Sequence, residues 1–195
     1  MLETIYISFL FIFILIFIFY KKSNPNLVSV QTKNGLKFSI YKDKLQIKKT
    51  ELMGDIITNM ILLKEHLINN KNDFPEEDKE YIDLLKDNFD VNKTIIYETE
   101  PESDLTSYSV NKGQELSICL KSKKNNQLHD INLFMYVSIH EMAHMGCPDI
   151  GHGETFKKVF KFFIEEAIKI NVYKYVNYSE NPTEYCGMNL SSSII

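Results

Sequence analysis

The amino-acid sequence predicts an α+β fold, in which a small mixed or antiparallel sheet packs on one histidine-bearing helix, preceded by an N-terminal transmembrane helix. Short runs of alternating apolar and polar residues, separated by turn residues, are typical of strands. Longer stretches carry apolar residues at helical spacing. The first stretch of the chain is apolar all round, which is typical of a helix in a bilayer. With 195 residues, the chain is long enough for one domain of ordinary size plus an appendage.

The N-terminal segment is apolar from residue 5 to residue 20, and two lysines follow it. As a helix, about 16 residues span roughly 24 Å, and lysines that reach toward the interface close most of the gap to a hydrocarbon core of about 30 Å. A secretory signal is disfavoured, because the segment lacks a basic amino end and a small-residue cleavage site. We therefore expect a transmembrane anchor at residues 1–22, which contacts the membrane through residues 5–20, and a globular domain at residues 23–195. Because the lysines follow the anchor, the chain is expected to be a single-pass membrane protein with a cytosolic C-terminal domain.

The net charge and the cysteine content argue against a nucleic-acid-binding protein and against a disulfide-rich secreted protein. The formal net charge is −4, so no basic surface is implied and direct nucleic-acid binding is not expected. The cysteines are Cys119, Cys147 and Cys186. This number is odd and too small for a disulfide framework, and a reducing compartment is the simpler interpretation.

The elements of the globular domain follow in order. Two alternating runs around Asn34-Gly35 predict a β-hairpin, because Asn-Gly is a strong signal for a tight turn. Apolar spacing predicts a helix at about 50–69, and a second helix at about 72–89 has Pro75 and acidic residues in its first turn. The remaining predictions are a strand at 94–98, a hairpin at 107–121, and helices at about 130–145 and 154–170. The tyrosine-rich tail after them has no clear pattern.

The segment HEMAHMGCPDIGH, from His140 to His152, holds three of the five histidines in the chain. His140 and His144 are four residues apart in a predicted helix, so their side chains project from one face and can bind a single Zn²⁺. Glu141 is rotated away from the first ligand, so it can reach a water on the metal without being a ligand itself. This H-E-x-x-H arrangement is typical of zinc hydrolases in which the glutamate is the general base. The alternative, a pair of core histidines with other partners, is disfavoured because an unpaired buried pair is costly.

A catalytic zinc needs a third protein ligand and an open position. The HExxHxxGxxH pattern of metzincins is excluded, because Cys147 and Ile150 replace its glycine and histidine. Glu165 or Glu166, on the following helix, lie near the distance at which thermolysin-type sites take a glutamate. Cys147 as a thiolate is a further candidate, but it follows the second histidine too closely. We favour His152, because the turn MGCPDIG allows the chain to reverse tightly and return this residue to the metal.

The motif H-E-M-A-H followed by G-H-G-E-T-F-K-K resembles the SprT-like and WLM-type zinc metallopeptidases, over about residues 94–170. The resemblance implies a minimal zincin-like domain with its core in this range, in a small membrane-anchored form like those of large DNA viruses. It implies that His140, His144 and His152 bind zinc and that Glu141 is the catalytic base. DNA-processing members of the family carry DNA-binding segments that are not evident here, so a role in processing DNA–protein crosslinks does not carry over.

We therefore predict a membrane-anchored zinc metallopeptidase, of endopeptidase type, that hydrolyses a protein or peptide substrate through a zinc-bound water activated by Glu141. Tyr185 is the candidate for stabilising the oxyanion, and backbone groups of the strand at 115–121 are expected to pair with an extended substrate. Phe156, one turn after His152, is expected to pack beneath the site. The alternative is a non-catalytic, zinc-stabilised structural or binding protein of a membrane or virion, which a fourth protein ligand on the zinc would favour.

Overall fold

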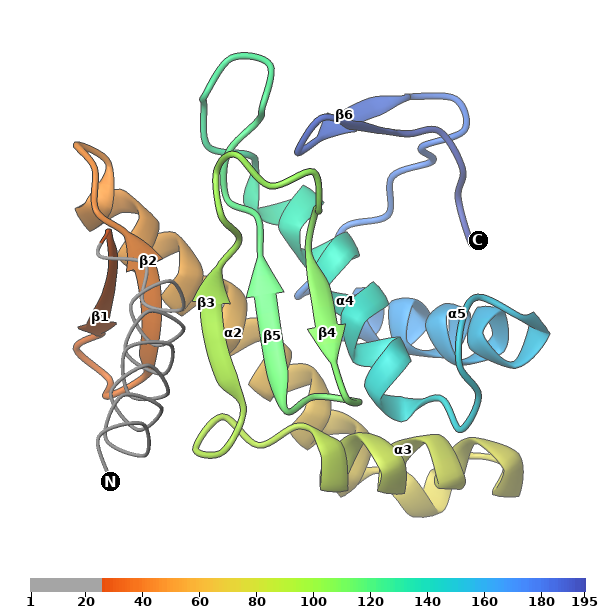
Figure 1. Ribbon diagram of the computed structural model, residues 1–195. Helices are drawn as coiled ribbons and strands as arrows, with labels where there is room; N and C mark the ends of the chain where they lie inside the picture. The colour runs from red at the N-terminus through yellow and green to blue at the C-terminus, as the bar shows by residue number, and fades with distance from the viewer. Residues whose placement is uncertain (1–25) are drawn as a thin grey trace, which may run out of the picture.

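The computed structural model describes residues 26–195, which form a mixed α+β fold with one main sheet and four α-helices (Figure 1). The 3₁₀ turn Lys71–Asp73 joins the first two of these helices. In chain order the strands and helices are β1 (Leu27–Gln31), β2 (Lys37–Tyr41), α2 (Gln46–Asn69), α3 (Glu76–Asn88), β3 (Ile95–Glu98), β4 (Tyr108–Val110), β5 (Glu115–Ile118), α4 (Ile131–Gly146), α5 (Glu154–Lys169), β6 (Thr183–Tyr185) and β7 (Met188–Leu190).

The main sheet has the strand order β1-β2-β3-β5-β4. Both predicted hairpins are confirmed, because β1 pairs antiparallel with β2 and β4 pairs antiparallel with β5. The pairs β2–β3 and β3–β5 are parallel, so the sheet is mixed. β5 is internal and has neighbours on both sides, whereas β4 and β1 are the edge strands. The expectation that the strand at 115–121 would pair with a substrate is therefore wrong, because the backbone of β5 is already paired on both sides, and β4 is the edge strand next to it.

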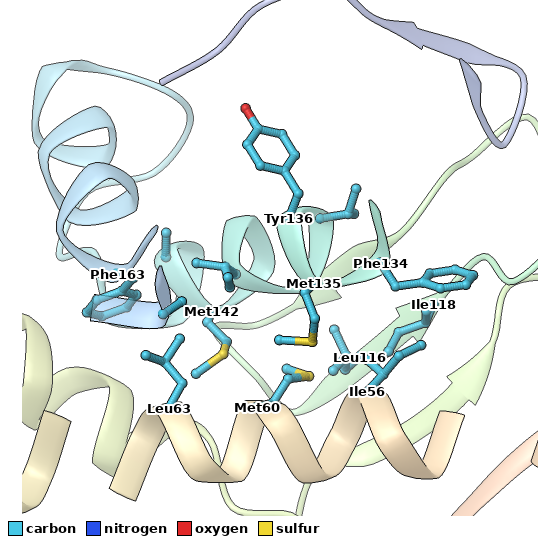
Figure 2. Packing of buried hydrophobic residues seen from close by; sticks show 14 of the residues in the cluster. Ile56, Met60, Leu63, Leu116, Ile118, Phe134, Met135, Tyr136, Met142 and Phe163 are labelled. Carbon is cyan, nitrogen blue, oxygen red and sulfur yellow. The ribbon is translucent and has the colours of Figure 1, made fainter. Parts of the chain in front are cut away.

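The hydrophobic core lies where α2, α4 and β5 meet (Figure 2). The side chains that meet there are almost fully buried: Ile56, Met60 and Leu63 from α2, Leu116 and Ile118 from β5, and Met135 and Met142 from α4. Burying one such side chain contributes about 1.5–3 kcal/mol. This apolar face holds α4 in place, and Tyr136, which is also buried, projects from the opposite side of α4, away from α2 (Figure 2).

Gly146, in the last turn of α4, marks a close approach of three helices. A Cβ at this position would lie 2.8 Å from the Phe163 ring of α5 and 3.0 Å from the Tyr81 carbonyl oxygen of α3. The Asn88 side-chain amide, at the end of α3, donates to the Met145 carbonyl oxygen at 2.8 Å and so satisfies a backbone acceptor at the end of α4. The end of α4 is therefore fixed by both neighbouring helices.

A buried ion cluster, which we call the Lys49 cluster, joins α2 to the sheet. It consists of Lys49, Glu98, Asp43 and Lys121. The Lys49 ammonium is fully buried and lies 2.8 Å from the Glu98 carboxylate and 3.1 Å from that of Asp43, while Lys121 donates to Asp43 at 2.7 Å. Burial raises the pKa of the Glu98 carboxyl despite this pairing. Burial also tends to raise the pKa of Asp43, but hydrogen bonds from Lys121 and Lys49 outweigh it and lower that pKa.

The C-terminal tail forms a second, two-stranded sheet from β6 and β7 (Figure 1). We call residues 183–190 the C-terminal hairpin. Its turn consists of Cys186 (φ 50°) and Gly187 (φ 87°), so both turn residues are left-handed, as in a type I′ turn. A disulfide links Cys186 to Cys119, which directly follows β5. The cysteine count did not predict this bond, because the fold brings together two cysteines that are 67 positions apart.

The expected localisation as a single-pass membrane protein is corrected. Across residues 26–195, no helix is both long and apolar enough to cross a bilayer. The predicted anchor at 1–22 and its membrane contact through 5–20 lie outside the residues that the structure describes.

Candidate metal centre and its cleft

Helix α4 presents His140 and His144 on its outward face. The helix begins after Asp130, whose carboxylate accepts a hydrogen bond from the Asn132 backbone N–H at 2.8 Å. The four-residue spacing brings the two imidazole rings to 4.8 Å between centroids, and their Nε2 atoms to 3.2 Å. Both rings are partly buried, because the rest of α4 packs into the core.

The loop 147–153 returns the chain so that His152 meets the other two histidines. Gly151 adopts φ 86°, which reverses the backbone at little cost for a residue without a side chain. Lys112, in the turn between β4 and β5, donates from Nζ to the carbonyl oxygens of Cys147 and Asp149, each at 2.6 Å. The His152 Nε2 atom then lies 3.0 Å from the Nε2 atoms of both His140 and His144.

We call these three residues the histidine triad, and within residues 26–195 they are the group of side chains that can hold a metal ion. Each Nε2 atom either carries a hydrogen or offers a lone pair. Of three such atoms in mutual contact, at least two must be of the same kind, so one of the three contacts is always unfavourable. A cation bound by three lone pairs removes this conflict.

The donor set also fits a metal by distance and by charge. Nitrogen ligands about 2.0–2.1 Å from a tetrahedral zinc lie roughly 3.3–3.4 Å apart, close to the 3.0–3.2 Å observed between the Nε2 atoms. Burial, followed by the neighbouring histidines, lowers the pKa of His140 to about 3. Burial and His152 lower that of His144 to about 4. Both rings are therefore neutral at pH 7, the state in which imidazole binds metals.

Phe156, in the first turn of α5, packs beneath the triad as predicted. Its ring centroid lies 4.9 Å from that of His140, 4.3 Å from that of His144 and 4.7 Å from that of His152. Phe160, one turn later, lies 5.2 Å from the His140 ring. These aromatic rings set the orientation of the imidazoles by contact and keep the inner side of the site apolar.

Glu141 is directed toward edge strand β4, away from the contacts among the triad. The carboxyl is buried, and this burial raises its pKa to about 7, while hydrogen bonds from the hydroxyl and backbone of Ser109 pull the pKa down in part. Ser109 thus orients the glutamate. Sequence reasoning missed Ser109, because its contact crosses from a strand to a helix and no local pattern marks it.

The triad and Glu141 line one cleft of about 750 Å³. The outward face of α4 forms its floor, and three walls surround it: residues 106–112 along β4 and its turn, the loop residues 149–152, and the C-terminal hairpin. Strand β4 brings polar groups, the loop brings Asp149 and the exposed apolar side chain of Ile150, and the hairpin side is apolar. The triad therefore lies between the loop on one side and the apolar hairpin on the other.

Tyr185 lines the same cleft, but its hydroxyl is occupied. The residue is fully buried, and its O–H donates to the Cys119 carbonyl oxygen at 3.0 Å and contacts the Ser107 hydroxyl at 2.5 Å. This pairing also ties β6 to the end of β5. The role of Tyr185 toward an oxyanion stays a prediction.

The alternative third ligands lie elsewhere. Glu166 is buried and pairs with His66 at 2.8 Å and Lys169 at 2.5 Å. Glu165 is half-exposed and lies 3.8 Å from Lys161. Cys147 is a buried free thiol at the end of α4. The structure brings none of these three to His140 and His144.

No family model matches the chain. It is 40% identical over 144 residues to the uncharacterized protein R325 of Acanthamoeba polyphaga mimivirus, a match that covers 74% of this chain and 72% of that protein. The chain belongs to the family of this viral protein.

The chain is also 31% identical over 84 residues to the uncharacterized protein 136R of Invertebrate iridescent virus 6, covering 42% and 47% of the two chains. The uncharacterized protein 042R of Invertebrate iridescent virus 3 is 33% identical over 70 residues, covering 36% and 43%. The expected kinship with proteins of large DNA viruses is confirmed.

Among solved structures, the chain is similar to a Wss1 mutant from Saccharomyces cerevisiae, with a TM-score of 0.49 and 15% identity over 68% of this chain and 88% of that chain. A second structure of Wss1 from Saccharomyces cerevisiae has a TM-score of 0.38 and 21% identity, over 48% and 72% of the two chains. A Wss1 mutant from S. pombe has a TM-score of 0.32 and 19% identity, over 48% and 89%. At these scores and identities, a shared activity does not follow from the likeness.

Proposed function

We propose that this chain is a zinc-dependent metallopeptidase that hydrolyses peptide bonds in a protein or peptide substrate. One observation carries the proposal: the histidine triad and the buried Glu141 carboxyl line the same cleft, beside the open edge of β4. A structural zinc is normally closed by a fourth protein ligand and has no use for an adjacent carboxyl group outside its ligand set. The triad within residues 26–195 supplies three ligands, which leaves one position for water or substrate and supports hydrolysis over a structural role.

Each group of residues in the cleft has its own role in the proposed hydrolysis. His140, His144 and His152 would hold zinc through Nε2, and the bound ion would supply a Lewis acid that polarises the substrate carbonyl and acidifies water. The Glu141 carboxylate accepts a proton from the attacking water and later delivers it to the nitrogen of the leaving amine. Ser109 holds that carboxyl in position by hydrogen bonds.

Strand β4 gives the substrate a place to bind. Because β4 is an edge strand of the main sheet and residues 106–109 line the cleft, an extended peptide can add to it as a further strand. Main-chain hydrogen bonds would then position the scissile carbonyl over the triad irrespective of most side chains. We therefore expect an endopeptidase that acts on extended or partly unfolded segments.

The test uses the full chain as wild type, Glu141→Gln and His152→Ala, with Glu165→Gln as a matched control on α5. We would measure zinc per chain and the cleavage of a partly unfolded protein such as casein. We expect wild type and Glu165→Gln to bind one zinc and to cleave. Glu141→Gln should keep zinc and lose activity by about 10²-fold or more, and His152→Ala should lose zinc. If all four proteins bind zinc equally and none cleaves, the proposal is wrong.

A further inference from the structure

One end of the cleft is apolar, and the C-terminal hairpin forms it. Tyr136 and Val137 lie one turn before His140 on α4, and Met188 and Leu190 come from β7. Tyr136 projects from the face of α4 opposite to Met135 and Met142 (Figure 2). Tyr136 and Val137 are nearly buried and Leu190 is partly buried, whereas Met188 is 46% exposed although it is large and apolar, so β7 provides most of the apolar surface beside the triad. Such an exposed apolar wall inside a cleft is typical of a ligand site.

The apolar side chains of β7 share one face of the strand. Because successive residues of a strand point to opposite sides, Met188 and Leu190 face one way and Asn189 faces the other. Met188 and Leu190 line the cleft, and Asn189 does not. The strand therefore presents its apolar face to the reactive groups.

The hairpin is fixed in place at its turn. The Cys119–Cys186 disulfide bonds it covalently to the strand end beside β4. The Cys186 backbone N–H donates to His129 Nε2 at 3.1 Å, and Tyr185 donates to the Cys119 carbonyl oxygen. On α4, Tyr136 is held by the rings of Tyr178 at 4.7 Å and Phe160 at 5.2 Å. Both sides of the apolar end are thus preorganised, as a selective site requires.

The order of contacts along β4 sets the direction of a bound substrate. Ser107, before β4, contacts Tyr185 of the hairpin, whereas Lys112, after β4, holds the loop at Cys147 and Asp149. β4 therefore runs from the hairpin toward the loop. A peptide added antiparallel, the more common and slightly more stable pairing, runs from the loop toward the hairpin. Its residue on the hairpin side of the triad is then the one that follows the scissile bond.

We propose that Met188 and Leu190, together with Tyr136 and Val137, form a specificity subsite for a large apolar side chain on the residue that follows the scissile bond. The inference rests on the proposed function, because the triad and Glu141 define where that bond lies. A leucine, methionine or phenylalanine would cover the apolar wall, whereas an aspartate or glycine would leave it exposed to water. The preference in kcat/KM for the large apolar residues is expected to be about tenfold or more.

The first part of the test is a cleavage profile. The full chain would cleave a mixed peptide library, and sequencing of the new amino termini would identify the residue after each cut. Wild type and the matched control Asn189→Ala should show leucine, methionine and phenylalanine enriched at this position. Met188→Asp and Leu190→Asp should lose the enrichment, and Met188→Ala, at a half-exposed side chain, should reduce it without a threat to folding. A wild-type profile with no apolar preference at this position, or one unchanged in all hairpin variants, overturns the inference.

The second part is a binding measurement that does not depend on turnover. Fluorescence anisotropy would compare labelled peptides with leucine or aspartate at one central position, bound to zinc-loaded Glu141→Gln with and without Met188→Asp. Tighter binding of the leucine peptide, lost in the Met188→Asp protein, supports the subsite even if wild type cleaves nothing and the proposed function fails. Equal binding of the two peptides, in a protein whose wild type does cleave, overturns the subsite and leaves the proposed function intact.

Discussion

The Lys49 cluster and the histidine triad are both groups of polar atoms in contact, but only the first is complete within the protein. In the cluster, the positive Lys49 and Lys121 alternate with the negative Glu98 and Asp43, and each contact joins a donor to an acceptor. In the triad, three chemically identical nitrogens meet at 3.0–3.2 Å, and no arrangement of hydrogens satisfies all three contacts. A cluster in which every donor has an acceptor stabilises the fold by itself. The triad, whose nitrogens cannot all pair, needs a bound cation to satisfy them.

The largest effect is expected from breaking the satisfied cluster. Lys49→Met leaves the buried Glu98 carboxylate without its cation, so the free energy of unfolding should fall by about 3–5 kcal/mol. Urea unfolding of the full chain measures this loss. The double variant Lys49→Met/Glu98→Leu should recover most of it, because no buried charge is then left unpaired. A single variant as stable as wild type would mean that the buried pair is not intact in solution.

Zinc should stabilise the folded protein by binding at the histidine triad and not at the Lys49 cluster. Zinc at about 100 times its dissociation constant should raise the free energy of unfolding by about 2.7 kcal/mol, because the ion binds the folded chain and not the unfolded one. The rise in Tm after zinc addition and its reversal by EDTA are the readouts. His144→Ala should abolish the response. An equal response in that variant would place the zinc elsewhere.

Without metal, the triad should contribute little to stability. His152 is exposed, and its removal also removes unfavourable contacts between like nitrogens. His152→Ala in EDTA should therefore unfold within about 0.5 kcal/mol of wild type. If His152→Ala lowered the free energy of unfolding as much as Lys49→Met does, the metal-free triad would stabilise the fold, contrary to this expectation.

A further small effect is a dependence on pH that separates the two carboxylates of the Lys49 cluster. The pKa of Asp43 is lowered in the folded chain, so its contribution to stability is present above its unfolded pKa of about 3.9 and is lost as the pH falls through the folded pKa. Asp43→Asn should therefore be less stable than wild type at pH 7, by at most about 1 kcal/mol, and the difference should close in acid. Glu98 has the opposite sign, because burial raises its pKa and protonation relieves the cost of its charge. Unfolding midpoints in urea at pH 7 and at pH 3 test both directions.

Local signals in the sequence predicted most of the fold. Asn34-Gly35 and the residues before β5 marked the two hairpins, and apolar spacing marked the helices, because both signals lie within a few neighbouring positions. The start of α2 at Gln46, earlier than expected, was missed because the only apolar residue of its first turn, Ile47, is exposed and marks no buried face. The C-terminal hairpin was missed because its Cys-Gly turn lacks the usual signal and because its position depends on Cys119, far away in the sequence.

In the candidate site, too, local sequence signals predicted some residues, whereas others depend on contacts between distant segments. His140, Glu141 and His144 are fixed by helical spacing, and the tight turn before His152 follows from Gly151 and its neighbours. Ser109 and Lys112 were not predictable, because each acts on a segment that is distant in the chain. The burial of Lys49 was not predictable either, since lysine on an amphipathic helix is normally exposed and only the folded sheet supplies its partners.

The disulfide closes a covalent ring whose two ends are 67 residues apart in sequence, and that ring contains α4, the loop with His152, and α5. A single cut between Cys119 and Cys186 would therefore not release a fragment, since both pieces stay attached through sulfur. If the chain were cut once within this ring, the product would have the mass of the intact chain plus one water until it was reduced. Cleavage of the chain in this region is visible by electrophoresis only under reducing conditions.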